Sequence, residues 1–287
     1  MRKIALILLL LALNQKGYSQ YDRVSFYVVA HPDQWQLFMG LNASDDLSTP
    51  DDAIKSKVVF IYTTAGDQSC NGSPCNTPHY LARQEAAHTA IEFCSDRTRD
   101  HGQWHTSHDV VNGHTILKYN YNNAVSYCLR LPDGCNGNSL FKESLQSLHS
   151  GNSSISAIDS SATYHDWNDL ITTVQQIMTN ERSNIGDMYV NTADTDAVLN
   201  KGDDPDHIYT GLLCLNALDS MHHLTINLFR EAIIASLPAN TDDIAIAAKA
   251  ALLSQMDYVR TENGMPSEWT PQNISYLSRN YLRTVTR

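Results

Sequence analysis

Two short runs of consecutive apolar residues stand out in the first quarter of the chain. SFYVVA covers residues 25–30, and KVVFIYT covers residues 57–63. Runs of this length, rich in β-branched and aromatic residues, are typical of strands buried on both faces of a sheet. Residues 187–192 (DMYVNT) and 224–229 (LTINLF) predict two further strands. Residues 114–131 predict extended segments, and the turn sequence PDG follows them.

Three other segments place apolar residues at helical spacing. They cover residues 78–94, 165–181 and 241–259. The third predicts the clearest helix, because acidic residues fill its first turn and alanine and leucine fill its body. Thr241 is its expected N-terminal cap.

The alternation of strands and helices predicts an α/β fold. We expect βαβ units that build a Rossmann-like, mostly parallel sheet with helices on both faces. No internal repeat or low-complexity linker divides the chain, so a single domain over residues 20–287 is predicted. The serine-rich residues 144–166 predict a surface excursion.

The first nineteen residues have the three-part pattern of a secretory signal peptide. Arg2 and Lys3 precede an apolar run over residues 4–13, and small residues follow near Ser19. The run is too short to span a bilayer as a helix. We therefore expect residues 1–19 to be removed and the mature protein to be secreted or periplasmic.

Charge narrows the choice of partners. The chain carries 20 basic and 31 acidic residues, and loss of the predicted signal peptide would change the formal charge from −11 to −14. This balance argues against nucleic acid or an anionic membrane surface as the main partner. It is compatible with a neutral sugar or a metal ion.

Six cysteines in an exported chain permit disulfides. The pairs Cys70–Cys75 and Cys128–Cys135 would each close a short loop, whereas Cys94 and Cys214 could equally be buried free thiols. The pairing stays open. The sequence has no C-x-x-C, so nothing in it supports a zinc ribbon or a thioredoxin-like redox site.

Candidate chemistry follows the predicted strands. His31 and Asp33 come directly after the first strand, and TTAGD (residues 63–67) follows the second. Open α/β sheets bind ligands outside the carboxyl ends of their strands, so these residues should share one edge. Farther along, Pro205 suits the first position of a helix capped by Asp204. His207 would then lie in its first turn.

Two motifs together resemble a known family. AHPD (residues 30–33) after the first strand, with PDH (205–207) at the start of a later helix, resembles the PIG-L/LmbE-like family of zinc-dependent N-acetylglucosaminyl de-N-acetylases. Four other motifs match the family in the expected order: TTAGD, ARQEAA (82–87), LRLPDG (129–134) and AALLSQ (250–255). The resemblance therefore covers about residues 24–256.

The resemblance implies roles for individual residues. His31 and His207 would bind one zinc ion per chain, and Gln34 occupies the position of the remaining metal ligand. Asp33 would act as general base toward a water activated by the metal, which attacks an acetamide carbonyl. Arg83 and Asp67 would contact the substrate.

The sequence departs from the family pattern at two of these positions. Gln34 replaces an aspartate, and its neutral amide oxygen would bind a divalent ion less strongly. Asp204 stands at a catalytic position where many relatives carry a histidine or asparagine, the histidine helping to polarise the carbonyl. The charge of Asp204 would instead repel a developing oxyanion. We expect Gln34→Asp to tighten zinc binding about tenfold. Unchanged affinity would mean that another residue, such as Asp204, supplies the missing ligand.

The expected activity is removal of an acetyl group from an N-acetylated sugar or glycoconjugate. Two alternatives stay open: a non-catalytic glycan-binding descendant that lost the metal through Gln34, and a metal-dependent O-acetyl esterase. A second possible metal site, formed by His101, His105 and His108, lies in a segment without an apolar pattern, which predicts a solvated loop.

Overall fold

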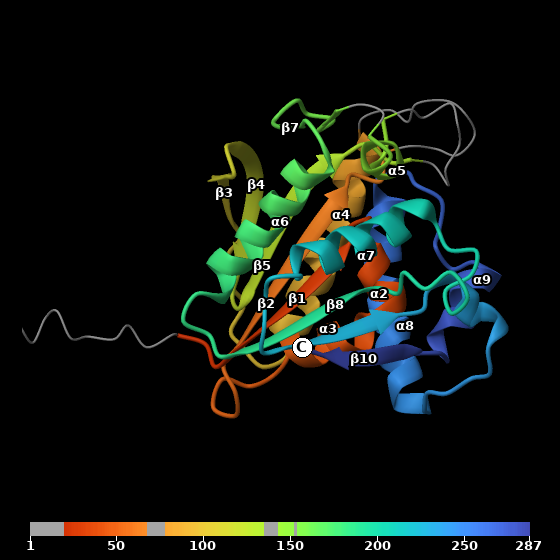
Figure 1. The fold of residues 1–287 in the computed structure, drawn as a ribbon. Helices are drawn as coiled ribbons and strands as arrows, with labels where there is room; N and C mark the ends of the chain where they lie inside the picture. Colours follow the sequence, from red (N-terminus) through yellow and green to blue (C-terminus); the bar gives the residue numbers. More distant parts are fainter. Residues whose placement is uncertain (1–19, 68–77, 135–142, 152–153) are drawn as a thin grey trace, which may run out of the picture.

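The computed structural model describes residues 20–67, 78–134, 143–151 and 154–287 (Figure 1). The described chain folds around one eight-stranded sheet with the strand order β10-β9-β8-β1-β2-β5-β4-β3. Its strands are β1 (Arg23–Val29), β2 (Ser56–Thr64), β3 (His105–Val111), β4 (His114–Tyr121), β5 (Ala124–Leu131), β8 (Asp187–Ala193), β9 (Leu224–Phe229) and β10 (Leu282–Thr286). The two short strands β6 (Ile155–Ser156) and β7 (Thr163–Tyr164) pair separately.

The helices connect these strands and cover both faces of the sheet. They are α2 (Gln34–Phe38), α3 (Gly40–Leu47), α4 (Pro78–Ser95), α5 (Leu145–His149), α6 (Trp167–Arg182), α7 (Pro205–Ala217), the 3-10 helix η2 (Ala232–Ser236), α8 (Asp243–Glu262) and α9 (Pro271–Leu277). Helices α6 and α7 lie across one face, while α3 and α4 lie behind the other, with α8 packed against α4 (Figure 1). The expected α/β fold with a mostly parallel sheet is thus confirmed.

The centre of the sheet is parallel and its two edges are antiparallel. Strands β9, β8, β1, β2 and β5 run in one direction, whereas β4, β3 and β10 run antiparallel to their neighbours. From β1 the chain enters β2, crosses to the edge strand β3 and comes back through β4 to β5, and it later passes to the other side of β1 for β8 and β9. Strand β1 is therefore the topological switch point, where such sheets open a crevice for ligands.

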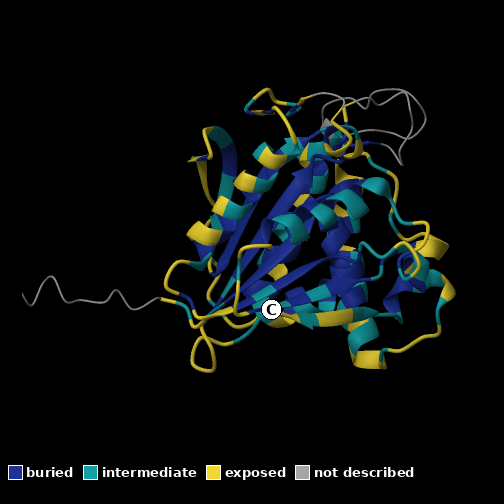
Figure 2. Ribbon diagram, viewed as in Figure 1, coloured by how far each residue is buried: buried dark blue, intermediate teal, exposed yellow. Residues whose placement is uncertain are grey.

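The sequence of β1 does not alternate between polar and apolar residues, and the packing of the strand explains this. Phe26 and Val28 belong to the core cluster on the side of α6 and α7. Tyr27 and Val29 belong to the cluster on the opposite side, together with Trp35 of α2. Both faces of the central strands are therefore buried, as Figure 2 shows in dark blue. The continuous apolar run follows from helices covering both faces.

Three details differ from the sequence predictions. The predicted loop over residues 101–109 is wrong from His105 onward, because β3 begins there and pairs with β4. Most of β3 is exposed on both faces, so its sequence carries no burial pattern. Asp242, not Thr241, caps α8, since its side chain accepts a hydrogen bond from the Ala245 N–H. The serine-rich region includes the ordered elements α5, β6 and β7.

The described cysteines are buried thiols. Cys94, Cys128 and Cys214 are free and buried. Cys70, Cys75 and Cys135, like the predicted signal peptide, lie outside the described residues. Among the described helices, none combines the length and apolar character needed to cross a bilayer.

Candidate metal centre

One edge of the sheet collects ionisable side chains from four strand ends. His31 follows β1, Asp133 follows β5, and Glu231 follows β9. Asp203 lies between β8 and α7, and His207 lies in the first turn of α7. All five lie at the carboxyl edge of the parallel strands, beside the switch point at β1. The structure thus brings together the two histidines that the separate motifs placed at one edge.

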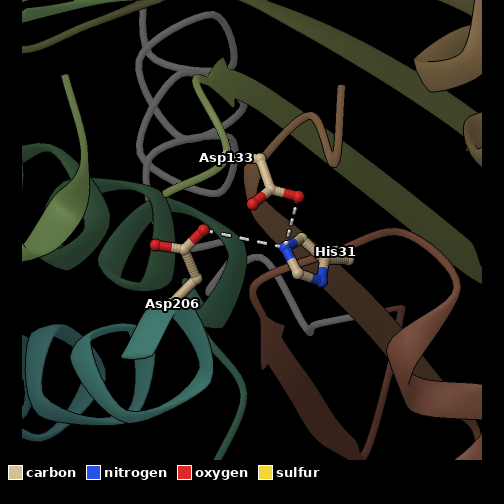
Figure 3. Close-up of side chains that lie close together, drawn as sticks. All are labelled: His31, Asp133 and Asp206. Atoms are coloured by element: carbon tan, nitrogen blue, oxygen red, sulfur yellow. Dashed lines mark ion pairs between the residues drawn. The ribbon is translucent and has the colours of Figure 1, made fainter. Parts of the chain in front are cut away.

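His31 faces two carboxylates (Figure 3). Its Nε2 atom lies 3.3 Å from Oδ2 of Asp133 and 3.7 Å from Oδ2 of Asp206. The Nε2 atom is buried, and neither carboxylate gives it a well-directed hydrogen bond. Burial alone would lower the pKa of His31, but the two carboxylates outweigh it and raise that pKa to about 10. The backbone N–H of Gly134 donates to Oδ2 of Asp206 at 2.7 Å and fixes that carboxylate.

His207 is held in a similar way by another pair of carboxylates. Its Nδ1 atom lies 2.7 Å from Oε2 of Glu231 and 3.0 Å from Oδ1 of Asp203. Burial opposes the charged imidazolium, but these two acids raise the pKa of His207 well above its ordinary value. Asn200 donates to the second oxygen of Asp203 at 2.8 Å and fixes its orientation.

The two imidazole rings lie next to each other. Their centroids are 5.3 Å apart and their planes meet at 67°. Within the described part of the chain, no hydrogen bond occupies Nδ1 of His31 or Nε2 of His207. Each ring therefore directs one nitrogen at a pair of carboxylates, where a cation could replace the proton between them.

The donor set fits a divalent cation. Two groups of three residues each place ligand atoms within 4.8 Å of one another: His31 with Asp133 and Asp206, and His207 with Asp203 and Glu231. Imidazole nitrogens and carboxylate oxygens are zinc ligands. Four largely buried carboxylates beside two imidazoles also concentrate negative charge that a cation would neutralise. The described residues could therefore hold a metal ion here.

Gln34 lies in this cluster, but its amide is fully used by the protein. Its Oε1 atom accepts hydrogen bonds from the backbone N–H of Ala30 at 2.7 Å and of His31 at 3.4 Å. Its Nε2 atom donates to both carboxylate oxygens of Glu231, each at 2.7 Å. The amide therefore presents a donor, rather than a ligand oxygen, to the residue that contacts His207.

Asp33 is held by two arginines. Its Oδ2 atom accepts from Nε of Arg83 at 2.8 Å and from Nη1 of Arg260, which also pairs with Glu268. Burial would raise the pKa of Asp33, but the two guanidinium groups hold it well below its ordinary value. Arg83 also donates to the Gly66 carbonyl at 2.6 Å. Asp33 is therefore ionised and a weak proton acceptor in this arrangement.

The other two predicted site residues have structural contacts at the same edge. Asp204 caps α7 by accepting from the Asp206 N–H at 2.8 Å, and Pro205 opens the helix, so the predicted cap is confirmed. Asp67 accepts from the Asp133 N–H at 3.0 Å and so supports the loop that carries Asp133. Asp204 lines the pocket at this edge, whereas Asp67 does not.

A pocket of about 320 Å³ opens above the cluster. Its volume is at the lower end of the range for small-molecule sites. His31, Asp33 and His207 are among its lining residues, and α9 contributes polar and aromatic groups. Phe38 and Tyr276 form an edge-to-face pair at 5.0 Å in its wall. The complete lining comprises His31, Asp33, Gln34, Leu37, Phe38, Arg83, Gly202, Asp203, Asp204, His207, Ala232, Met256, Glu268, Gln272, Asn273 and Tyr276.

The alternative histidine group does not converge on one point. His101 forms a hydrogen bond with Asp96 at 2.7 Å, while His105 and His108 lie exposed on β3. An odd spacing of three residues places those two side chains on opposite faces of the strand. This segment forms none of the metal-binding groups found in the described residues.

Sequence reasoning missed several residues of the cluster. Asp133 was interpreted as part of a turn, and Glu231 was not singled out, although it follows a predicted strand as His31 does. The same rule about strand ends could have found both. Nothing in the sequence around Arg260 indicated that it reaches Asp33 from the far end of α8.

No protein-family model matches the chain, and comparison with curated proteins finds no significant match.

Proposed function

We propose that the chain is a metal-dependent hydrolase, with zinc as the metal, that removes an acetyl group from an N-acetylated sugar or glycoconjugate. The observation that carries this proposal is the convergence of His31 and His207 with buried carboxylates beneath one pocket. The order and spacing of the motifs around these histidines resemble zinc-dependent de-N-acetylases, which supports the choice of reaction.

The two histidines and the carboxylates beside them would hold the ion. Zinc bound there would supply a Lewis acid that polarises an acetamide carbonyl and lowers the pKa of a water molecule. Asp133 and Asp206 face Nε2 of His31, and Asp203 and Glu231 face Nδ1 of His207, so the carboxylates and imidazoles already converge where they would share an ion. The protein thereby orients both imidazoles before substrate arrives.

Asp33 is the proposed proton acceptor, and its arginine partners control that role. With both guanidinium groups in contact, the pKa of Asp33 is too low for efficient proton transfer near neutral pH. A substrate hydroxyl or carbonyl that draws Arg83 away from Asp33 would raise this pKa. Arg83 lines the pocket, so it is placed for such an exchange.

The first test is the metal content of the purified protein, with His31→Ala and His207→Ala beside it. We expect about one zinc per chain in the unaltered protein and loss of zinc in both variants. Acetate release from N-acetylated amino sugars should follow the metal content. A protein that takes up no zinc, even after incubation with it, would contradict the proposal.

A glycan-binding protein without catalysis is the second candidate function. The observation that favours it is the double ion pair of Asp33, which weakens the proposed base. Binding of N-acetylated sugars without acetate release by the zinc-loaded protein would support it. Faster acetate release from matched O-acetyl sugars than from N-acetyl sugars would instead identify an esterase.

A further inference from the structure

Gln34 and Glu231 form a buried pair that joins two distant parts of the chain. Gln34 opens α2 directly after the β1 end, whereas Glu231 follows β9. The Gln34 side-chain amide donates to both oxygens of the Glu231 carboxylate at 2.7 Å. Glu231 is fully buried, and its Oε2 atom lies 2.7 Å from Nδ1 of His207.

The backbone fixes the direction of this amide. Oε1 of Gln34 accepts from the Ala30 and His31 N–H groups, so Nε2 is the end that must face Glu231. A carboxylate at position 34 would confront the Glu231 carboxylate without a donor between them. A glutamine at 34 and an acid at 231 are therefore compatible, whereas acids at both positions repel each other.

We propose that Glu231 supplies, beside His31, His207 and Asp203, the carboxylate ligand of the divalent cation that position 34 lacks, and that Gln34 is its positioning residue. The proposal rests on the metal centre argued above and changes its ligand set. The carboxylate missing at position 34 is supplied from β9, so the local negative charge is kept. Gln34 then does not indicate a lost metal site. The amide and the carboxylate have instead exchanged places between positions 34 and 231.

Three ligand atoms already lie close together in this group. Nδ1 of His207 lies 3.0 Å from Oδ1 of Asp203 and 2.7 Å from Oε2 of Glu231. Asp203 is anchored by Asn200, and Asn200 also accepts from the Glu231 N–H at 2.9 Å. One asparagine thus supports both acids, which keeps them directed at the same imidazole. Ligands whose orientation is fixed in this way bind metals more tightly.

Zinc affinity tests the exchange without any measurement of activity. We would compete a chromogenic chelator for zinc against the unaltered protein, Glu231→Gln, Gln34→Asp and the double variant Gln34→Asp/Glu231→Gln. We expect Glu231→Gln to weaken binding by at least about a hundredfold, and Gln34→Asp alone to give no gain, in place of the tenfold gain expected from the sequence alone. The double variant returns one carboxylate and one amide to the pair, so it should recover affinity to within about tenfold of the original.

A remote buried acid provides the control. Glu181 pairs with Lys57 and Lys118 at the opposite end of the sheet, and Glu181→Gln should leave zinc affinity unchanged. Unchanged affinity in Glu231→Gln, or a tenfold gain in Gln34→Asp, would overturn the exchange while leaving the metallohydrolase proposal intact. An unaltered protein that binds no zinc would overturn both proposals. Loss of affinity in Glu231→Gln with no recovery in the double variant would overturn the role of Gln34.

Discussion

His31 and Asp33 are separated only by Pro32, yet their surroundings have opposite charge. Two carboxylates face His31, and two guanidinium groups face Asp33. The first arrangement raises the pKa of the imidazole, and the second lowers the pKa of the carboxyl group. The site therefore keeps both groups charged near neutral pH when no ion is bound. Each charge is matched locally, which limits the cost of burying it.

The Arg260–Asp33 contact should contribute strongly to stability. Arg260→Met removes one partner of Asp33 and the ion-pair partner of Glu268, and leaves both acids in a largely buried network. We expect the free energy of unfolding to fall by about 3–5 kcal/mol. The exposed Arg287–Asp219 pair is the control, and Arg287→Met should cost less than about 1 kcal/mol. Similar small losses in urea unfolding for both variants would contradict this assignment.

His31 should make the stability of metal-free protein depend on pH. Its folded pKa of about 10 lies above the ordinary value of 6.5. The stabilisation is therefore complete below pH 6.5 and is lost as pH rises from 6.5 to about 10, at about 1.4 kcal/mol per unit. Urea unfolding in the presence of a chelator should show this decline. Asp133→Asn should flatten it, and a slope that does not change in that variant would contradict the role of Asp133.

The elements that were predicted from the sequence are those whose buried faces leave a pattern of apolar residues. The elements without such a pattern were missed. β1 and β2 were predicted because both faces of each strand are covered. The start of α7 was predicted because capping depends on neighbouring residues alone, here Asp204 and Pro205. β3 was missed because its side chains face solvent on both sides, and its pairing with β4 leaves no trace in hydrophobic periodicity.

Close packing of α7 against the end of β8 positions His207. A Cβ atom on Gly211, one helical turn after His207, would lie 2.5 Å from the Ala193 carbonyl oxygen. Gly211→Ala should push the helix outward, lower the free energy of unfolding by about 1–3 kcal/mol and weaken zinc binding. Gly186→Ala is the matched control, because nothing lies within 4 Å of its added carbon. Equal zinc affinity in both variants would show that helix position does not control the site.

At the scale of the whole molecule, the centre depends on the strand order. Residues near positions 31, 133, 203 and 231 meet only because β5, β2, β1, β8 and β9 are parallel neighbours. From the sequence we expected the carboxyl ends of the parallel strands to lie at one edge of the sheet, and therefore His31 and His207 to lie close together. The sequence could not predict that Glu231 would reach Gln34, or that Arg260 would reach Asp33, since these contacts depend on how β9 and α8 pack.

Because the centre joins four strand ends, an ion bound there should stabilise the entire fold. A ligand that binds only the folded state adds about 2.7 kcal/mol at a hundred times its Kd. For a domain of this size, that corresponds to a rise in Tm of about 5–10 °C. We expect this rise when zinc is added to chelator-treated protein, measured by differential scanning calorimetry.

The variants separate the proposed centre from zinc bound at the surface. His31→Ala/His207→Ala should abolish the rise in Tm, because it removes both imidazoles between the four carboxylates. His105→Ala/His108→Ala removes two exposed histidines of β3 and should leave the rise unchanged. A rise that disappears only in the second variant would place zinc on β3, and it would remove the main support for a metal centre at the carboxyl edge of the sheet.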